Sequence, residues 1–517
     1  VDASFQNTGV VRVLAGELVL GGGGSNAAGA TITVGNASLN TGSGNLTNTT
    51  GLVRVGQTLT VQSASVDNSL TRAFNSDGTP KAMGLEGNTI ALTTAHLNNT
   101  QGAVRAAQDL ALYSDGQLIN DQGELSAGRN LLVTTGQAST PSTTPTLRIS
   151  NQAGQILADQ SVNVRTGSLS GAGTLASKGD VTLSLQGDHT LAGTLLAGGN
   201  LSLSVTGQMT NPISVQAGNN LSVSAANLDN QATGELQSGQ TTTLNIANTL
   251  NNRGLIDGSD TRIQAGTARN LGTGRLYGDR VAIAATSLVN QEETLSGTTT
   301  AATIAGRERV DIGVQTLTNR ENALVYSGGD IAMGGALDAN WRATGTAQTL
   351  SNNSATLEAA QNLSVQASSI RNTNEHFAAE IRQTSQSTLT EYQGSGATRR
   401  YKSGDADVYI FNDQSDYLHT PEGSYEQWTQ YNYTRTVNES LITQSAPGKI
   451  LAGGGITLIA SNVLNDKSQI VAGGTLSVRN GRRKGVIVTC QFQPTTHHAE
   501  EEPAQRRSRQ KTRPHRR

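Results

Sequence analysis

The segment Gly193–Asn230, GTLLAGGNLSLSVTGQMTNPISVQAGNNLSVSAANLDN, contains one sequence unit twice. Ala197-Gly198 precedes the alternating triplet Leu201-Ser202-Leu203, and 20 residues later Ala217-Gly218 precedes Leu221-Ser222-Val223. Because alternating apolar and polar residues predict a strand with one buried face, each triplet marks a short strand. A fixed spacing of this kind is typical of repeat proteins, in which one structural unit stacks on the next.

The same triplet recurs along most of the chain. Within the runs that start at Ile90 and Val162, successive triplets begin 19 to 21 residues apart. From residue 281 onward the intervals lengthen, and we expect the extra residues, such as Glu292–Ala301, to form loops outside the stack. We expect further loops at Asn68–Lys81 and Ser139–Pro145. The triplets begin at Ile32, Leu59, Ile90, Leu110, Leu131, Val162, Val181, Leu201, Leu221, Thr242, Arg262, Val281, Val310, Ile331, Leu363, Ile456 and Leu476.

Each unit has room for about three short strands and three corners, which is one coil of a parallel β-helix. A second strand precedes the triplet, as in Glu235–Gly239, and a third follows it and ends in asparagine, as in Ala226–Asn230. With coils about 4.8 Å apart, the repeats predict a rod on the order of 80 Å long. The recurrent asparagines should stack into amide ladders inside the corners. They include Asn230, Asn252, Asn290, Asn319 and Asn465.

Two other repeat folds with comparable signatures fit less well. A leucine-rich repeat follows the pattern L-x-x-L-x-L-x-x-N and has a helical side, whereas this chain follows L-x-V-x-A-x-x-L-x-N and has no long helical pattern. The calcium-binding β-roll needs G-G-x-G-x-D runs, which are absent. The prediction is therefore an all-β protein, a parallel β-helix or β-solenoid.

The composition agrees with a repeat protein and is compatible with export, although cytosolic proteins can also lack cysteine. The chain has 59 glycines, 9 prolines and 3% aromatic residues, and its single cysteine, Cys490, excludes a disulfide framework. It begins at Val1 without a recognisable signal peptide and contains no run of 18 apolar residues, so we expect no membrane span. We expect the mature part, or an internal fragment, of a longer exported protein.

Residues 373–447 differ from the repeats and carry 10 of the 17 aromatic residues. Tyrosine and tryptophan are favoured at recognition surfaces because they combine a large apolar area with a polar group. Two interpretations stay open and are compatible: the aromatics form the small core or cap of an inserted β-domain, or they contact a partner. The candidate partner-binding residues are Tyr392, Tyr401, Tyr409, Phe411, Tyr417, Tyr425, Trp428, Tyr431 and Tyr433.

The C-terminal segment 481–517 changes composition again. From Arg479 onward the chain has 11 basic and 3 acidic residues, while the preceding 478 residues have 26 basic and 36 acidic residues. A block of like charge usually indicates disorder or a polyanion-binding tail. Because the change cuts a repeat directly after Val478, we interpret the segment as a disordered tail from a reading-frame change or a truncated gene. We expect no binding to nucleic acid.

The sequence offers no catalytic, cofactor-binding or metal-binding constellation. The seven histidines are scattered, and the H-E-x-x-H, G-x-S-x-G and P-loop motifs are absent. Parallel β-helices also include polysaccharide lyases and hydrolases that act through carboxylates on one outer face. Here the recurring acids Asp229, Asp257, Asp260 and Asp279 occupy predicted turns. A carbohydrate-active enzyme is therefore the second hypothesis, and acids clustered beside a groove would favour it.

Units such as LLAGGNLSLSVTG, VQAGNNLSVSAANLDN and LAGGGITLIASNVLNDKSQIVAGGTLSV resemble the repeats of filamentous haemagglutinin adhesins. The segment Asn438–Val478 is similar to contact-dependent growth-inhibition effectors of the CdiA type, in which a Tyr-rich region interrupts the repeats near the receptor-recognition part. The resemblance covers about residues 30–480. No toxin domain or VENN motif is present, so no toxicity is expected of this chain.

The resemblance implies a right-handed β-helical filament exported through an outer-membrane two-partner secretion transporter. It also implies adhesion to a cell-surface receptor, protein or glycan, and a location outside the cell or on the bacterial surface. The expected domains are a β-solenoid at 1–372, a Tyr-rich insertion or junction at 373–447, resumed repeats at 448–480 and a basic tail at 481–517. A product of a truncated gene, without activity of its own, is the third hypothesis.

Overall fold

The computed structural model describes residues 5–19, 24–137, 140–141, 144–412, 416–479 and 488–490. All regular structure in these residues is β-strand. The chain divides into two compact units. The solenoid unit contains Val1–Glu375 and Pro447–Cys490, and the described residues of the other unit, here called the insert unit, lie in His376–Ala446.

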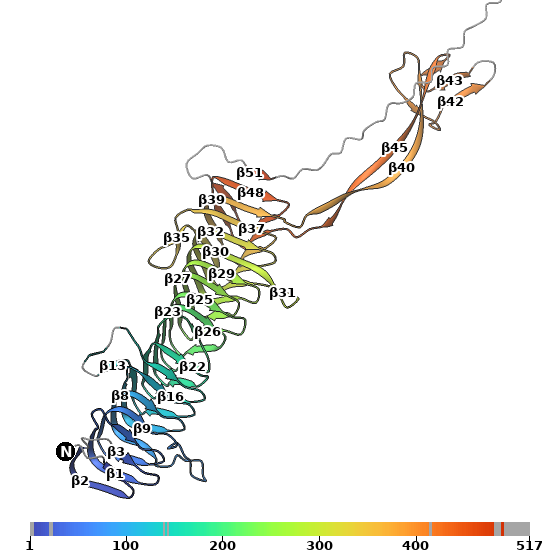
Figure 1. Cartoon of the computed structure of the whole chain (residues 1–517). Helices are drawn as coiled ribbons and strands as arrows, with labels where there is room; N and C mark the ends of the chain where they lie inside the picture. Colours follow the sequence, from blue (N-terminus) through green and yellow to red (C-terminus); the bar gives the residue numbers. More distant parts are fainter. Residues whose placement is uncertain are drawn as a thin grey trace, which may run out of the picture. The chain divides into compact units, whose positions relative to one another are not determined.

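The solenoid unit is a column of coils with three faces of parallel strands (Figure 1). In one coil, β24 (Ser214–Ala217) lies on the first face. β25 (Leu221–Asn230) then passes through the second and third faces, with an irregularity between Ala225 and Leu228 where it turns the corner. The next coil, β26 (Glu235–Ser238) and β27 (Thr241–Asn252), pairs with it in parallel along all three faces. This arrangement confirms the predicted parallel β-helix.

The core follows from the alternation within each strand. Leu221 and Val223 point inward and are buried, whereas Ser222 between them is exposed. Leu221 lies opposite Leu201 of the preceding coil and Val223 opposite Leu203. Equivalent side chains therefore stack on one another from coil to coil, and they form one apolar core that runs through the unit. A single coil exposes this face on both sides, so the coils depend on one another for stability.

Asparagines at the end of the third face, all buried except the half-buried Asn465, donate hydrogen bonds from coil to coil. Each side-chain amide nitrogen lies 2.7–2.9 Å from the amide oxygen of the next asparagine. This confirms the predicted amide ladder. The first run contains Asn7, Asn26, Asn48, Asn68, Asn99, Asn120 and Asn151, and the second contains Asn211, Asn230, Asn252, Asn270, Asn290, Asn319, Asn352, Asn372 and Asn465.

Two expected loops contain strands. Glu292–Ala301 forms an antiparallel hairpin in which the end of β30 (Arg275–Leu295) pairs with β31 (Thr298–Ala301). Ser296 and Gly297 between them both have positive φ, 51° and 81°, as a tight two-residue hairpin turn requires. Of the expected loop at Ser139–Pro145, the structure describes 140–141 and 144–145; Thr140–Pro141 pairs with Gly136–Gln137.

The expected disordered tail at 481–517 falls almost entirely outside the described residues. The exception is β51 (Val488–Cys490), which pairs in parallel with β48 (Asn462–Asp466). At these three residues the structure differs from the expectation, because the ladder of the third face continues onto them.

Candidate recognition face of the insert unit

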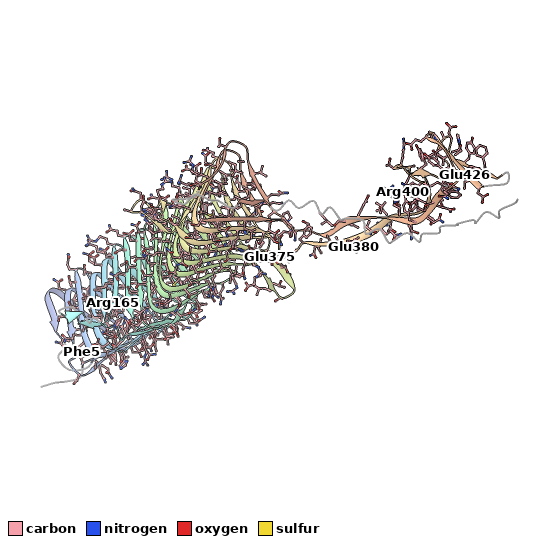
Figure 2. All side chains as sticks on the ribbon, turned by 90° about the horizontal axis from the view of Figure 1, so that it is seen from above. Phe5, Arg165, Glu375, Glu380, Arg400 and Glu426 are labelled. Carbon is pink, nitrogen blue, oxygen red and sulfur yellow. The ribbon has the colours of Figure 1, made fainter. Side chains whose placement is uncertain are left out.

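The insert unit consists of a two-stranded ribbon and two small antiparallel sheets. β40 (Ala378–Gly394) and β45 (Trp428–Gln444) pair along their length, and β41 (Tyr401–Lys402) adds a third strand at Glu391 and Tyr392. β42 (Tyr409–Asn412), β43 (Asp416–Thr420) and β44 (Gly423–Tyr425) form the second sheet. Within this unit, Arg400 and Glu426 lie at the end of the ribbon opposite to Glu380 (Figure 2).

Three of the nine candidate aromatics pack into a small core. Tyr401 is buried with Val408 and Leu418, and Tyr392, Ile410 and Trp428 pack against them. The rings of Tyr392 and Trp428 meet edge to face with centroids 5.6 Å apart. The indole nitrogen of Trp428 donates to the Asp416 carbonyl oxygen at 2.8 Å, so the polar atom of the ring is also satisfied. These three aromatics therefore have a structural role.

Three other candidates fix the ribbon locally. The hydroxyl of Tyr431 donates to Gln393 Oε1, and the hydroxyl of Tyr433 donates to Glu391 Oε1, both at 2.8 Å. The hydrogen bond to Glu391 raises the pKa of Tyr433, because it favours the protonated phenol. Arg400 lies 3.9 Å from the centroid of the Tyr431 ring, and Tyr425 covers Gly394.

The remaining candidates, Tyr409, Phe411 and Tyr417, lie on the outer side of β42 and β43. Ile410 and Leu418 point into the core, so alternation places their neighbours on the opposite side. Tyr409 lies opposite His419 and Phe411 opposite Tyr417 in the antiparallel register. We call Tyr409, Phe411, Tyr417 and His419 the aromatic face.

The rings of the aromatic face are close together yet open to solvent. The Tyr409 centroid lies 4.9 Å from that of Phe411 and 4.8 Å from that of His419. Tyr409 is 45% exposed and Phe411 is 40% exposed. Exposed large apolar side chains in a group, unlike scattered ones, indicate an interaction site.

Polar groups border the aromatic face. The Tyr417 hydroxyl donates to Glu426 Oε1 at 2.8 Å, and His419 Nδ1 lies 2.9 Å from Ser424 Oγ. Sequence reasoning missed His419, Ser424 and Glu426. The pattern Tyr-Ile-Phe at 409–411 and Tyr-Leu-His at 417–419 carried the signal, because it alternates core and outer residues in two adjacent strands.

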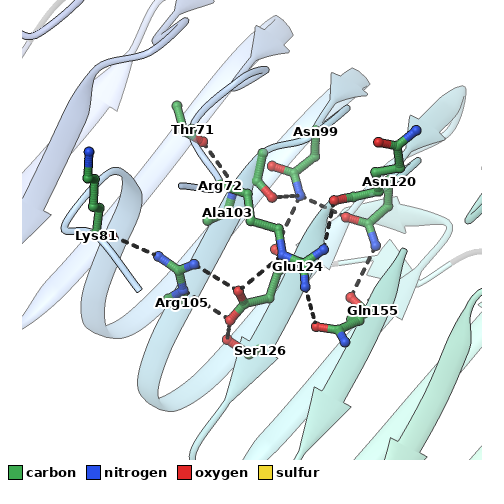
Figure 3. A network of polar contacts seen from close by, with 12 residues as sticks. Thr71, Arg72, Lys81, Asn99, Ala103, Arg105, Asn120, Glu124, Ser126 and Gln155 are labelled. Atoms are coloured by element: carbon green, nitrogen blue, oxygen red, sulfur yellow. Dashed lines mark hydrogen bonds and ion pairs between the residues drawn. The ribbon is translucent and has the colours of Figure 1, made fainter. Parts of the chain in front are cut away.

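A charged cluster in the solenoid unit bears on the enzyme hypothesis (Figure 3). Glu86 and Glu124 lie on the first face near a shallow groove of about 420 Å³ lined by Arg54, Glu86 and Arg105. Arg54 pairs with Glu86 at 2.6 Å, and Arg105 donates two hydrogen bonds to Glu124 at 2.8 and 3.0 Å. Burial opposes ionisation of Glu124, but hydrogen bonds from Arg105 and Ser126 and the positive charges of Arg105 and Arg72 together lower its pKa. A carboxylate held charged in this way is a poor proton donor.

The four acids predicted to occupy turns lie within or at the ends of strands instead, and most of them are engaged by arginine. Asp229, Asp260 and Asp279 each lie 3.0–3.5 Å from the side chain of an arginine, Arg253, Arg262 and Arg307 respectively. Across the described ranges, no group of three or more His, Cys, Asp or Glu side chains is arranged to hold a metal ion. The same residues contain no helix that is long and apolar enough to cross a membrane.

Replacing Glu124 with glutamine is expected to lower the free energy of unfolding at pH 7 by about 1.5–3 kcal/mol, because the charge-assisted hydrogen bonds of Arg105 are lost. Since the pKa of Glu124 is lowered in the folded state, its contribution is present above the pKa of the unfolded chain and disappears as the pH falls through the folded value. Urea unfolding from pH 7 to pH 3 should therefore show the two proteins converging in acid.

The control for this measurement is Asp159→Asn. Asp159 pairs with Lys178 in an ion pair whose side chains are 51% and 77% exposed, so the substitution should change stability little at either pH. A Glu124→Gln protein as stable as the wild type at pH 7 would contradict the assignment of this cluster as a stabilising network.

Comparison with protein-family models identifies the family of the repeats. The family model described as haemagglutinin repeat matches residues 1–79, 87–155, 146–211, 216–302, 278–390 and 429–487. The chain belongs to the haemagglutinin repeat family. Searches of curated proteins and of solved structures returned no significant match.

The family assignment confirms the resemblance drawn from the repeats, and the matched residues include nearly all coils of the solenoid unit. Haemagglutinin repeat proteins are secreted or cell-surface adhesins rather than enzymes, and the repeats support an adhesin-type stalk of two-partner secretion. The repeat matches at 278–390 and 429–487 stop short of residues 391–428, which contain the aromatic face.

Proposed function

We propose that this haemagglutinin repeat chain is a segment of a secreted filamentous adhesin, in which the solenoid unit is the stalk and the insert unit binds a cell-surface receptor. Export by an outer-membrane two-partner secretion transporter belongs to this proposal, as do the domain division at 372, 447 and 480 and a relationship to growth-inhibition effectors. The observation that carries it is the aromatic face, where four rings stand on the outer side of strands whose other side fills the core.

The exposed area of the rings matches the contact area of a small ligand. An aromatic side chain offers about 150–250 Å², and Tyr409 and Phe411 are 45% and 40% exposed. Together they present on the order of 150–200 Å², whereas a protein partner usually covers about 800 Å². The small apolar surface with polar groups at its border therefore favours a sugar ring of a cell-surface glycan over a protein.

Replacing both Tyr409 and Phe411 with alanine is expected to reduce binding of the labelled chain to bacterial or animal cells at least tenfold, since exposed aromatic contacts commonly contribute about 1–2 kcal/mol each. The matched control is Phe74→Ala, which removes a ring that is 50% exposed on the solenoid unit. Circular dichroism and the fluorescence of Trp428, measured with Trp341 replaced by phenylalanine in every variant, verify that the insert unit is folded.

A variant lacking residues 373–447 separates the alternatives. Equal binding by the wild type, the double variant and the deletion variant would place adhesion on the solenoid surface and refute the proposed site. If only the wild type and Phe74→Ala bind, competition by soluble saccharides and protease treatment of the cells distinguish a glycan from a protein receptor.

A further inference from the structure

Within residues 144–211, the ladder of the third face is interrupted. β18 (Ser168–Ser170) pairs with β15 (Arg148–Ser150) of the preceding coil, and β21 (His189–Thr190) pairs with β23 (Leu201–Asn211) of the following coil. Within residues 144–211, all of them described, no strand pairing joins β18 to β21. The same two coils are paired on the other faces, through β19 (Thr174–Ser177) with β22 (Thr194–Ala197) and β20 (Asp180–Leu185) with β23.

The two unpaired segments differ in length and in the residues that they place in the third face. Thr166 lies opposite Leu185, and Thr174 lies opposite Thr194. The chain between these points has seven residues, 167–173, in one coil and eight, 186–193, in the next. Length alone does not account for the interruption, because 206–213 and 226–234 of the following coils also differ by one residue and still pair, with an irregularity between Val205 and Gln208. The residues differ as well: the place of Leu169, opposite Ile149, is taken in the next coil by His189, opposite Met209.

The amide ladder stops at the same coils. The position after Ser150 is Asn151, but the position after its partner Ser170 is Gly171, and Leu191 takes the place opposite Asn211. The amide nitrogen of Asn151 is left 3.4 Å from the Thr174 carbonyl oxygen, in place of the usual bond to another asparagine. A cavity of about 60 Å³ opens here, lined by Asn151, Gly171, His189 and Leu191 among others.

We infer that this joint, residues 167–173 and 186–193, is where the solenoid opens first. Repeat proteins are stabilised by the contact of each unit with its neighbours. At the joint, the contact between the two coils lacks the third-face ladder and the asparagine hydrogen bond, and it contains a cavity. This contact is therefore weaker than the others. The coils before and after the joint then unfold as two cooperative blocks. The joint is also a hinge of the stalk, where the third face can open while the strands of the first and second faces remain paired.

Hydrogen exchange of the full chain, followed by mass spectrometry, tests the inference. The amides of 168–171 and 188–191 should exchange at least 100-fold faster than those of 227–230 and 249–252, which hold the same place in coils with an intact ladder. Equal protection in the two sets would overturn it.

A repair variant provides an independent measurement. Residues 206–213, TGQMTNPI, have the eight-residue length and supply an asparagine, so we would place this sequence at 167–173 and at 186–193. Exchange at the joint should slow at least tenfold and the two unfolding transitions should merge. A folded repair variant with unchanged exchange would refute the inference, and if the variant does not fold, the exchange comparison in the wild type decides.

Discussion

Replacing Asn252 with aspartate is expected to destabilise the solenoid unit by about 3 kcal/mol or more, because the change removes a buried donor and adds an acceptor. The Asn252 amide nitrogen donates to Asn270 Oδ1 at 2.8 Å and to the Gly254 carbonyl oxygen at 3.1 Å, and the side chain is fully buried. A carboxylate oxygen in its place would face the oxygen of Asn270 at hydrogen-bond distance. The two side chains have nearly the same shape, so packing contributes little to the effect.

Asn245→Asp is the matched control, since Asn245 lies on the same strand with its side chain exposed. Urea unfolding followed by circular dichroism compares the two variants with the wild type. In the Asn252→Asp variant, the rate of amide hydrogen exchange should also rise most in the coils next to residue 252, because each asparagine of the ladder bonds only to the neighbouring coils. Loss of stability in both variants alike would mean that the ladder has no special role.

Gly254→Ala is expected to lower the free energy of unfolding by at least about 3 kcal/mol, at the upper end of overpacking effects. The effect is large because the added methyl group meets backbone atoms rather than a mobile side chain. A Cβ at Gly254 would lie 2.0 Å from the Gly234 carbonyl oxygen and 2.4 Å from the Gln231 carbonyl oxygen of the preceding coil. Both carbonyl groups belong to the corner that supports the asparagine ladder, so the neighbouring coil would have to move.

Gly35→Ala is the control for this substitution. Gly35 has negative φ like Gly254, but a Cβ there meets no atom within 4 Å, so alanine should be tolerated. The midpoint of thermal unfolding of the two variants provides the comparison. A Gly254→Ala protein that unfolds at the wild-type temperature would show that the corner adapts and that close coil spacing there is not a constraint.

The aromatic residues of the insert unit show what the sequence pattern does not determine, namely which side chains are buried and which are exposed. Tyr392 and Trp428 belong to paired strands and meet in the core, while Tyr409 and Phe411 stand outside. All four are aromatic residues of the same segment, 373–447. Their separation depends on which strands pair and which side faces the core, and these are contacts between residues far apart in the chain.

The sequence by itself determined the solenoid, its strand positions and its asparagine ladder. It did so because neighbouring coils are copies of one another, so a short pattern such as Leu221-Ser222-Val223 specifies both a strand and its partners. Only the tertiary structure decided the division of the aromatic residues, the hairpin at Glu292–Ala301 and the interrupted joint at Gly171 and Leu191. There the outcome rests on which strands pair and in which register, and these are contacts between residues that lie far apart in the chain.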